Sequence, residues 1–186
     1  MTVKSIPERF KECSFENFKA VYESQKDALL ILSSFAVDFH NSIEAGRNIV
    51  LSGPVCVGKT HLAAAVANAV DKQGFSVLFV SAPDFFRMLS DCQMDKGAKA
   101  LSDVFDELKQ PDLLIFDDVF VVDDDDTRAV YEVVDVRYRH KKPLLITSSL
   151  SSDDMLDLFG VGVMDRLRDG GGSVLNCDWP SGRDVK

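Results

Sequence analysis

The sequence predicts an α/β protein whose parallel sheet is covered by helices on both faces. Short apolar runs at 49–51, 76–81, 113–116 and 144–147 alternate with longer amphipathic stretches. This alternation is typical of parallel strands joined by helices. The chain has 186 residues, of which 46% are apolar, and this length suits one domain with a sizeable core.

The first forty residues are expected to form an extended segment followed by a helix. Residues 1–24 are mixed in character, with Pro7 and three phenylalanines, and we expect them to pack against the domain formed by 25–186. The stretch 25–41 shows helical spacing of apolar residues. Its apolar face consists of Ala28, Leu32, Phe35 and Phe39.

A complete phosphate-binding pattern follows the first expected strand. Residues 53–60, GPVCVGKT, match G-x-x-x-x-G-K-[ST] between an apolar run and the helix expected over 61–72. The loop amides and the helix N-terminus can hold a polyphosphate. Lys59 adds a charge against the β- and γ-phosphates, and the Thr60 hydroxyl can ligate Mg²⁺. The residues expected to contact ATP are Gly53, Pro54, Val55, Cys56, Val57, Gly58, Lys59, Thr60 and His61.

The remaining elements continue the alternation. Pro83 can begin a helix, 90–98 is weakly patterned, and a further helix is expected through 104–108. In the helix expected over 127–139, the inward residues are Val130, Val133, Val134 and Tyr138. The last expected elements are two short helices and a strand, at 153–159, 163–168 and 173–176.

Polar groups follow the third and fourth strands, at the sheet edge where ligands of such folds bind. The third strand, LLIFDD, ends in Asp117 and Asp118. We assign Asp117 to Mg²⁺, through its water shell, and Asp118 to orienting or deprotonating the attacking water. The fourth strand ends in Thr147, Ser148 and Ser149, whose hydroxyls could reach the γ-phosphate or the water.

The charge pattern argues against a protein that coats duplex DNA. The net charge is −9 and the pI is near 4.8. The basic run 137–142 fits a helix C-terminus, or else a local contact with single-stranded DNA together with the segment after Phe86. The acidic run 123–126 fits a loop leading into a helix capped near Asp126, or else a second metal site.

The cysteines and the N-terminal sequence favour a cytoplasmic protein. The four cysteines have no paired spacing, as expected of reduced thiols. The first ten residues lack the apolar core of a secretory signal, and no apolar run is long enough for a membrane helix. We therefore expect no membrane partner.

Several segments together resemble the AAA+ ATPases of the DnaC/IstB group, the bacterial helicase loaders and transposition helper ATPases. The similar segments are IPERFKECSFENF (6–18), GKTHLA, LLIFDD, RY followed by PLLITSS, VMDRLRDGGG (163–172) and DWPSGR (178–183). The resemblance implies a P-loop NTPase of the AAA+ class, with a five-stranded sheet of order 5-1-4-3-2 and an active site completed between neighbouring subunits. It places the arginine finger at Arg166 and the second sensor arginine at Arg183.

The sequence departs from the family pattern in three ways. Cys56 stands where the loop usually has glycine, so the turn must accept a side chain. Ser149 stands at a sensor position that is usually asparagine, which predicts slow hydrolysis. Neither the N-terminal module by which loaders grip the helicase nor room for a helical lid is expected, so the lid is absent or vestigial.

Two functions of different class follow from the resemblance. The first is an ATPase that assembles with itself or another AAA+ subunit and controls assembly on a replicative helicase or single-stranded DNA. The second is a nucleotide-gated switch with little hydrolysis that acts on a helicase loader or another AAA+ partner. A transposition helper ATPase shares the machinery of the first and differs only in its partner.

Overall fold

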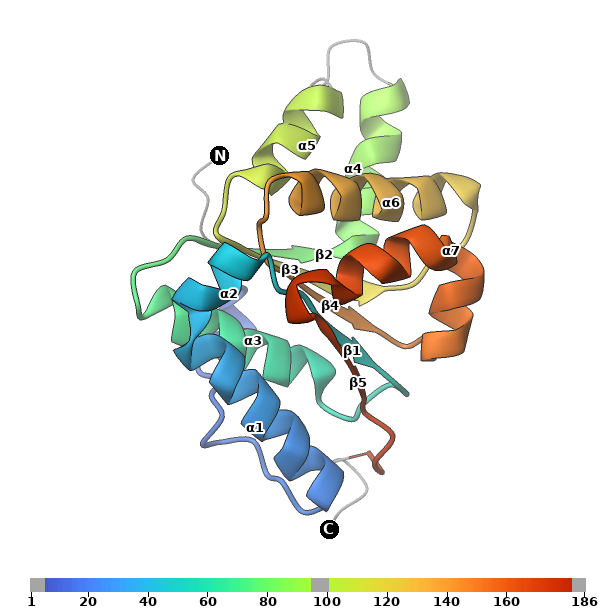
Figure 1. Ribbon diagram of the computed structural model, residues 1–186. Coiled ribbons are helices and arrows are strands. Elements are labelled where there is room, and N and C mark those ends of the chain that lie inside the picture. The colour runs from blue at the N-terminus through green and yellow to red at the C-terminus, as the bar shows by residue number, and fades with distance from the viewer. Residues whose placement is uncertain (1–5, 95–100, 182–186) are drawn as a thin grey trace.

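The computed structural model describes residues 6–94 and 101–181, which form one five-stranded parallel sheet (Figure 1). The strand order is β2-β3-β4-β1-β5, which is the expected order 5-1-4-3-2 read from the other edge. The strands are β1 (Ile49–Ser52), β2 (Val77–Ser81), β3 (Leu113–Val119), β4 (Leu144–Ser148) and β5 (Ser173–Asn176). Every neighbouring pair runs parallel, so the expected fold class is confirmed.

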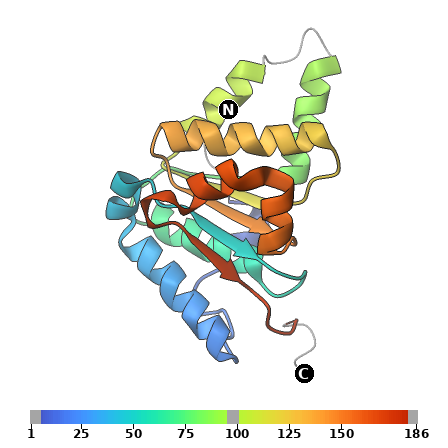
Figure 2. The ribbon, with the colours of Figure 1, turned by 45° about the vertical axis from the view of Figure 1, so that its right-hand side comes forward.

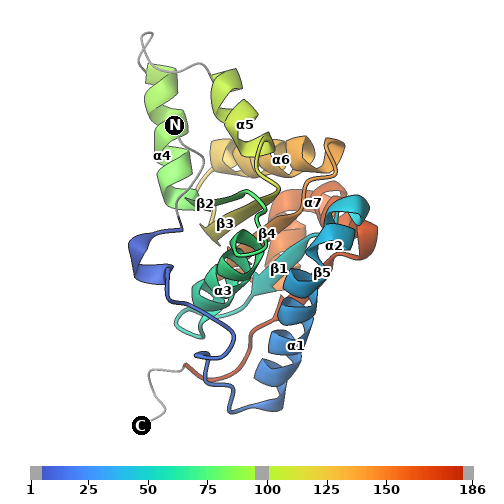
Figure 3. The ribbon, with the colours of Figure 1, turned by 90° about the vertical axis from the view of Figure 1, so that its left-hand side faces the viewer.

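Seven helices cover the described sheet in two layers (Figures 1 and 3). They are α1 (Glu23–Val37), α2 (Phe39–Ala45), α3 (Lys59–Asp71), α4 (Ala82–Met94), α5 (Leu101–Lys109), α6 (Asp124–Arg139) and α7 (Ser152–Arg168). Helices α1, α2 and α3 pack on one face, and α4 to α7 pack on the other. Figure 3 shows α4 and α5 extending beyond the sheet on the β2 side.

Alternate strand residues supply the two cores. On β3, Leu113 and Ile115 pack towards α3, whereas Leu114 and Phe116 pack towards α6. All four are fully buried. This two-sided burial explains why the strands read as continuous apolar runs rather than as alternating ones.

The N-terminal segment lies against α3, as Figure 3 shows. Phe10, Phe15 and Phe18 are partly buried against the core. The Asn68 side-chain amide of α3 donates to the carbonyls of Phe10 and Cys13, at 2.9 and 2.8 Å. These contacts fasten an otherwise irregular segment to the helix that follows the phosphate loop.

Several boundaries differ from the expected ones. The helix expected over 25–41 is two helices, because Asp38 leaves the helical conformation at ψ 35°. The weakly patterned stretch from residue 90 is helical to Met94, and residues 95–98 lie outside the described part of the chain. The two short pieces at 153–168 form α7, which is broken at Gly160 (φ 78°, ψ 165°).

The acidic run 123–126 caps α6. The Asp123 carboxylate accepts from the Asp126 amide at 2.9 Å, and the Asp126 carboxylate accepts from the Val122 amide at 2.9 Å. The cap is therefore Asp123, one turn earlier than expected. Within 6–94 and 101–181 no group of three potential ligands that could hold a metal ion occurs, so the second metal site has no support.

Arg137 of the basic run is buried rather than solvated. The residue is 1% exposed, and its guanidinium donates to the carbonyls of Leu108, Pro111, Asp112 and Pro143 at 2.5–3.1 Å. Arg137 therefore cannot contact a nucleic acid. Tyr138, expected to face inward, is 41% exposed instead.

The described helices include none that could cross a membrane, since none combines the necessary length with the necessary apolar character.

Candidate nucleotide site

The phosphate loop connects the fully buried strand β1 to α3, and two glycines fix its path. Gly53 (φ 139°) and Gly58 (φ 99°) both lie in the left-handed half of backbone space. A Cβ on Gly53 would sit 2.4 Å from the Cys177 carbonyl oxygen, and one on Gly58 would sit 2.7 Å from the Phe18 ring. Both positions therefore require glycine for conformation and for space.

Lys59 is folded against this loop. Its side chain is buried, and the ammonium donates to the carbonyls of Gly53 and Pro54, both at 2.6 Å. Burial lowers the pKa of Lys59, because it disfavours the charged form, and the nearby acids Asp118 and Asp117 oppose this effect. The ammonium thus lies against the loop, close enough to the two acids for their charges to act on it.

Asp117 and Asp118 differ in burial because β3 continues through both residues, and neighbouring residues of a strand face opposite sides. The expected strand end at Phe116 is wrong, since β3 runs to Val119 with an irregularity between Phe116 and Val119 in its pairing with β4. Asp117 is buried, whereas Asp118 is exposed and has φ 58°. Irregularities of strand pairing change the direction in which side chains point, and they are common next to functional sites.

Asp117 sits in a small hydrogen-bonded cluster. The Thr147 hydroxyl donates to the Asp117 carboxylate at 2.6 Å and accepts from the Asp118 amide at 2.8 Å. Burial raises the pKa of Asp117, while hydrogen bonds from Thr147 and Thr60 act in the opposite direction. Thr60 and Asp117, which the sequence predicts as the metal-binding pair, are therefore in contact.

The three hydroxyls at the end of β4 are not equivalent, since Thr147 and Ser148 belong to the strand and Ser149 follows it. Thr147 bonds the acid pair, and Ser148 donates to the Val119 carbonyl at 2.6 Å, so neither hydroxyl is free to reach a phosphate or water as expected. Ser149 lines a cavity of about 490 Å³ together with Asp118 and Val55. Of these three residues, Ser149 alone lines a cavity together with Asp118.

A second cavity, of about 170 Å³, adjoins the other end of the loop. Its lining residues come from the loop, from α3 and from the N-terminal segment: Asn17, Phe18, Lys19, Gln25, Cys56, Val57, Gly58 and His61. Of the four lining residues before the loop, Asn17 and Phe18 end the similar segment 6–18, which is the one sequence signal that points there. No motif includes Lys19 or Gln25.

The segment after β5 supports the loop from behind. The Cys177 amide donates to the Ser52 carbonyl at 2.6 Å, the Trp179 indole donates to the Val57 carbonyl at 2.8 Å, and the Ser181 hydroxyl donates to the Cys56 carbonyl at 3.3 Å. Burial raises the pKa of the Cys177 thiol to about 12. Arg183, the expected second sensor, lies two residues further on and outside the described residues.

Cys56 adopts φ 65° in the loop, a conformation that favours glycine. We expect Cys56→Gly to raise the free energy of unfolding by about 0.5–1 kcal/mol, because relief of the strain outweighs the extra entropy of glycine in the unfolded chain. Urea denaturation measures the change. Cys56→Ala keeps a Cβ and is the control; equal stabilities of the glycine and alanine variants would contradict the assignment of strain.

Arg166 lies far from this loop. Its carbonyl accepts from the Asn48 side chain at 3.2 Å, and Asn48 precedes β1, whereas the loop follows the other end of that strand. The guanidinium lies over the Tyr131 ring, 5.2 Å from its centroid, and 3.5 Å from the Asp135 carboxylate. It therefore points towards α6 and away from the phosphate loop of its own chain.

Comparisons with known proteins identify the family of the chain. A family model described as IstB-like ATP binding protein matches residues 6–167. The replicative helicase loader DnaC of Escherichia coli (strain K12) is 30% identical over 179 residues, which cover 93% of this chain and 70% of the relative.

Solved structures share the fold. A crystal structure of the DnaC helicase loader superposes with a TM-score of 0.79 at 24% identity and covers 91% of this chain and 99% of its own. The replication initiator DnaA, solved with AMPPCP and single-stranded DNA, gives a TM-score of 0.74 at 22% identity, covering 95% of this chain and 52% of its own. The family match and the 30% identity to a helicase loader together show that the chain belongs to the IstB-like ATP-binding family of P-loop AAA+ proteins.

Proposed function

We propose that the protein is a helicase-loader ATPase, in which ATP binding and hydrolysis control assembly with further AAA+ subunits on a replicative helicase or single-stranded DNA. The observation that carries this proposal is the meeting of Lys59, Thr60 and the acid pair at one sheet edge, with Arg166 beyond the reach of that edge. The relative named as a replicative helicase loader supports the choice of partner.

In this proposal the loop amides and Lys59 bind the triphosphate. The Lys59 ammonium exchanges the Gly53 and Pro54 carbonyls for phosphate oxygens, which replaces two neutral acceptors by charged ones. The cavity beside Phe18 and His61 takes the nucleobase, because it adjoins the loop on the side away from Asp118. Arg183 would approach the bound nucleotide from the segment after Ser181.

A magnesium ion fits the pair formed by Thr60 and Asp117. Hydroxyl and carboxylate oxygens are the ligands that this hard cation takes, together with water and phosphate oxygens. Asp117 is buried with a raised pKa, and a cation beside it would favour the carboxylate form. When bound, the ion would neutralise charge on the β- and γ-phosphates.

Asp118 and Ser149 then face the attacking water. They line the same cavity, so the carboxylate can accept a proton from a water that the Ser149 hydroxyl helps to orient. Arg166 would act on a neighbouring subunit, because its backbone lies at the opposite end of β1. A self-associated or mixed AAA+ assembly would thus complete the site.

Lys59→Ala tests the site itself. We expect the affinity for ATP to fall about 10- to 100-fold, since one charge-assisted interaction with the phosphates is lost. Isothermal titration with ATP measures this loss, and co-sedimentation with the cognate replicative helicase reports whether assembly needs nucleotide. Lys72→Ala, a surface lysine beyond α3, is the control. An unchanged affinity of Lys59→Ala for ATP would contradict the proposal.

Thr147→Val tests the positioning of the acids. The change keeps the shape and leaves the Asp117 carboxylate and the Asp118 amide without their shared partner. We expect kcat to fall about tenfold or more while ATP affinity changes little, and Thr147→Ser to retain most of the turnover. A loss confined to affinity, or full activity of the valine variant, would contradict this role.

The nucleotide-gated switch remains the second candidate because of Ser149. A serine hydroxyl is shorter than an asparagine amide and holds the attacking water less firmly. Phosphate release measured with and without single-stranded DNA separates the two functions. Turnover that DNA or helicase stimulates supports the loader ATPase, whereas tight ATP binding with negligible turnover under every condition supports the switch.

A further inference from the structure

A groove of about 410 Å³ lies between α1 and the start of β5, away from the nucleotide site. Leu30, Ile31 and Phe35 of α1 form one wall, and Ile49 and Ser173 lie at the amino ends of β1 and β5. The phosphate loop follows the opposite end of β1. Figure 2 shows β5 at the edge of the sheet, with α1 on one side and α7 on the other.

The wall of this edge groove exposes apolar surface. Leu30 is 69% exposed and Ile31 is 38% exposed, whereas Leu32 and Phe35 of the same helix are fully buried. The side chains of Leu30 and Ile31 are thus next to buried core residues but remain exposed to solvent. Covering such side chains removes apolar surface from water and is therefore favourable.

The outer edge of β5 offers backbone groups for pairing. Among the described residues β5 pairs with β1 alone. The Ser173 amide donates to the Asn48 carbonyl and the Cys177 amide donates to the Ser52 carbonyl, so these alternate residues face inward. The backbone groups of Val174 and Asn176 therefore point away from the sheet, since hydrogen-bonding direction alternates along a strand.

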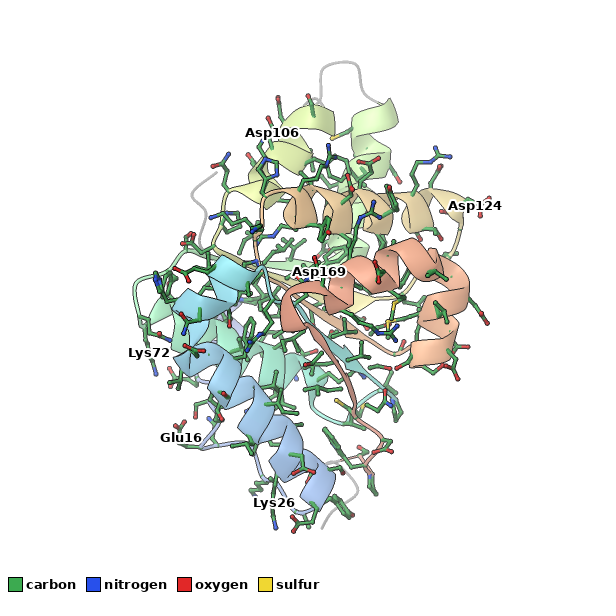
Figure 4. The ribbon with its side chains drawn as sticks, in the orientation of Figure 1. Glu16, Lys26, Lys72, Asp106, Asp124 and Asp169 are labelled. Carbon is green, nitrogen blue, oxygen red and sulfur yellow. The ribbon has the colours of Figure 1, made fainter. Side chains whose placement is uncertain are left out.

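Arg47 supplies one positive charge at the end of the groove. Its guanidinium lies against Gly171, where an added Cβ would be 3.5 Å from Nε. The Nε atom is buried and has no hydrogen-bond partner among the described residues. Asp169, the acid of the turn before β5 (labelled in Figure 4), hydrogen-bonds Tyr138 and so raises the pKa of that tyrosine.

We propose that the edge groove binds an extended peptide segment of another protein. The peptide pairs with β5 as a sixth strand through the outward groups of Val174 and Asn176. One of its apolar side chains covers Leu30 and Ile31, and one of its carboxylates pairs with Arg47. Backbone pairing gives such complexes affinity, and the side-chain positions give them specificity.

The chemistry of the groove selects this occupant. The Arg47 guanidinium fits a carboxylate in two-point geometry, and an apolar residue near an acidic one satisfies both ends of the groove. A second folded copy would bring its own α1 and α7 against the same helices, which flank β5 (Figure 2). A single extended chain carries no such helices.

The test uses a phage-displayed library of random twelve-residue peptides, selected on the purified protein. We expect enriched peptides to alternate apolar residues and to contain aspartate or glutamate. A synthetic peptide with the enriched sequence is then titrated by fluorescence anisotropy. Arg47→Gln and Leu30→Asp should each weaken its binding about tenfold, as should N-methylation of alternate peptide amides, while ATP binding is unchanged.

Val161→Asp is the matched control. Val161 is 74% exposed on α7 and lies outside the groove, so this variant should bind the peptide as the parent protein does. The proposal would be overturned if no peptides were enriched, or if the enriched peptides bound Arg47→Gln and Leu30→Asp as tightly as the parent protein. A dimer of the parent protein in sedimentation that Leu30→Asp dissociates would also overturn it, because a second copy would then cover the groove.

Discussion

Replacing Arg166 by alanine is expected to lower stimulated ATP turnover about 10³-fold or more while leaving ATP affinity unchanged. Arginine fingers supplied by a neighbouring subunit contribute 10³ to 10⁵ in rate by stabilising charge on the transferring phosphoryl group. Arg166 can serve in this way because it lies at the amino end of β1 and does not approach its own loop. Single-turnover hydrolysis, with the protein in excess over ATP and at a concentration that binds all of it, measures the chemical step directly.

A mixing experiment separates a finger acting in trans from one acting in cis. Lys59→Ala has an intact finger and Arg166→Ala has an intact loop, so an equimolar mixture contains some complete sites and should regain part of the turnover. Arg168→Ala, an exposed arginine two residues further along α7, is the matched control and should stay active. Loss of ATP affinity in Arg166→Ala, or no recovery on mixing, would contradict the assignment.

The sequence predicted the inner strands of the sheet well because β1, β3 and β4 are buried on both faces. A strand of this kind must be apolar at every position, so the runs at β1, β3 and β4 stood out. Their order came from the resemblance to the DnaC/IstB group, since periodicity alone carries no information about which strands are neighbours. The phosphate loop could be predicted equally well. Close contacts with Cys177 and Phe18 require glycine at positions 53 and 58, and these two glycines define the sequence pattern.

The sequence predicted fewer of the contacts within the site, because some of them join residues that are far apart in the sequence. Nothing near Thr147 in the sequence indicates that its hydroxyl bonds Asp117, thirty residues earlier. Likewise, the support of the loop by Trp179 spans 122 positions. Such pairs become visible only once neighbouring strands are aligned in register.

The misassigned face of α6 has a specific cause. From Val130 the helical spacing i, i+3, i+4, i+7 gives 133, 134 and 137, so the period places Arg137 inward. The expectation of an inward Tyr138 departs from this period by one residue. Periodicity was the better guide here, since four carbonyl groups at the chain turns around Leu108 and Pro143 make a polar pocket under the helix.

That pocket leads to the largest expected effect on stability. Arg137→Leu should lower the free energy of unfolding by about 4 kcal/mol, because four carbonyls that accept from the guanidinium are left without it and at least some remain buried. Burial lowers the pKa of Arg137 to about 9, so the group is still charged at neutral pH and its hydrogen bonds are charge-assisted. Urea denaturation monitored by far-UV circular dichroism gives the change.

Two further variants separate the hydrogen bonds of Arg137 from its charge. Arg137→Lys keeps the charge but cannot reach four acceptors from one ammonium, so we expect it to lose nearly as much stability as the leucine variant. Arg139→Ala removes an exposed cation paired with Asp135 and should cost less than about 1 kcal/mol. Near-parental stability of Arg137→Lys would mean that charge, rather than the geometry of the planar fork, holds α5, α6 and the start of β4 together.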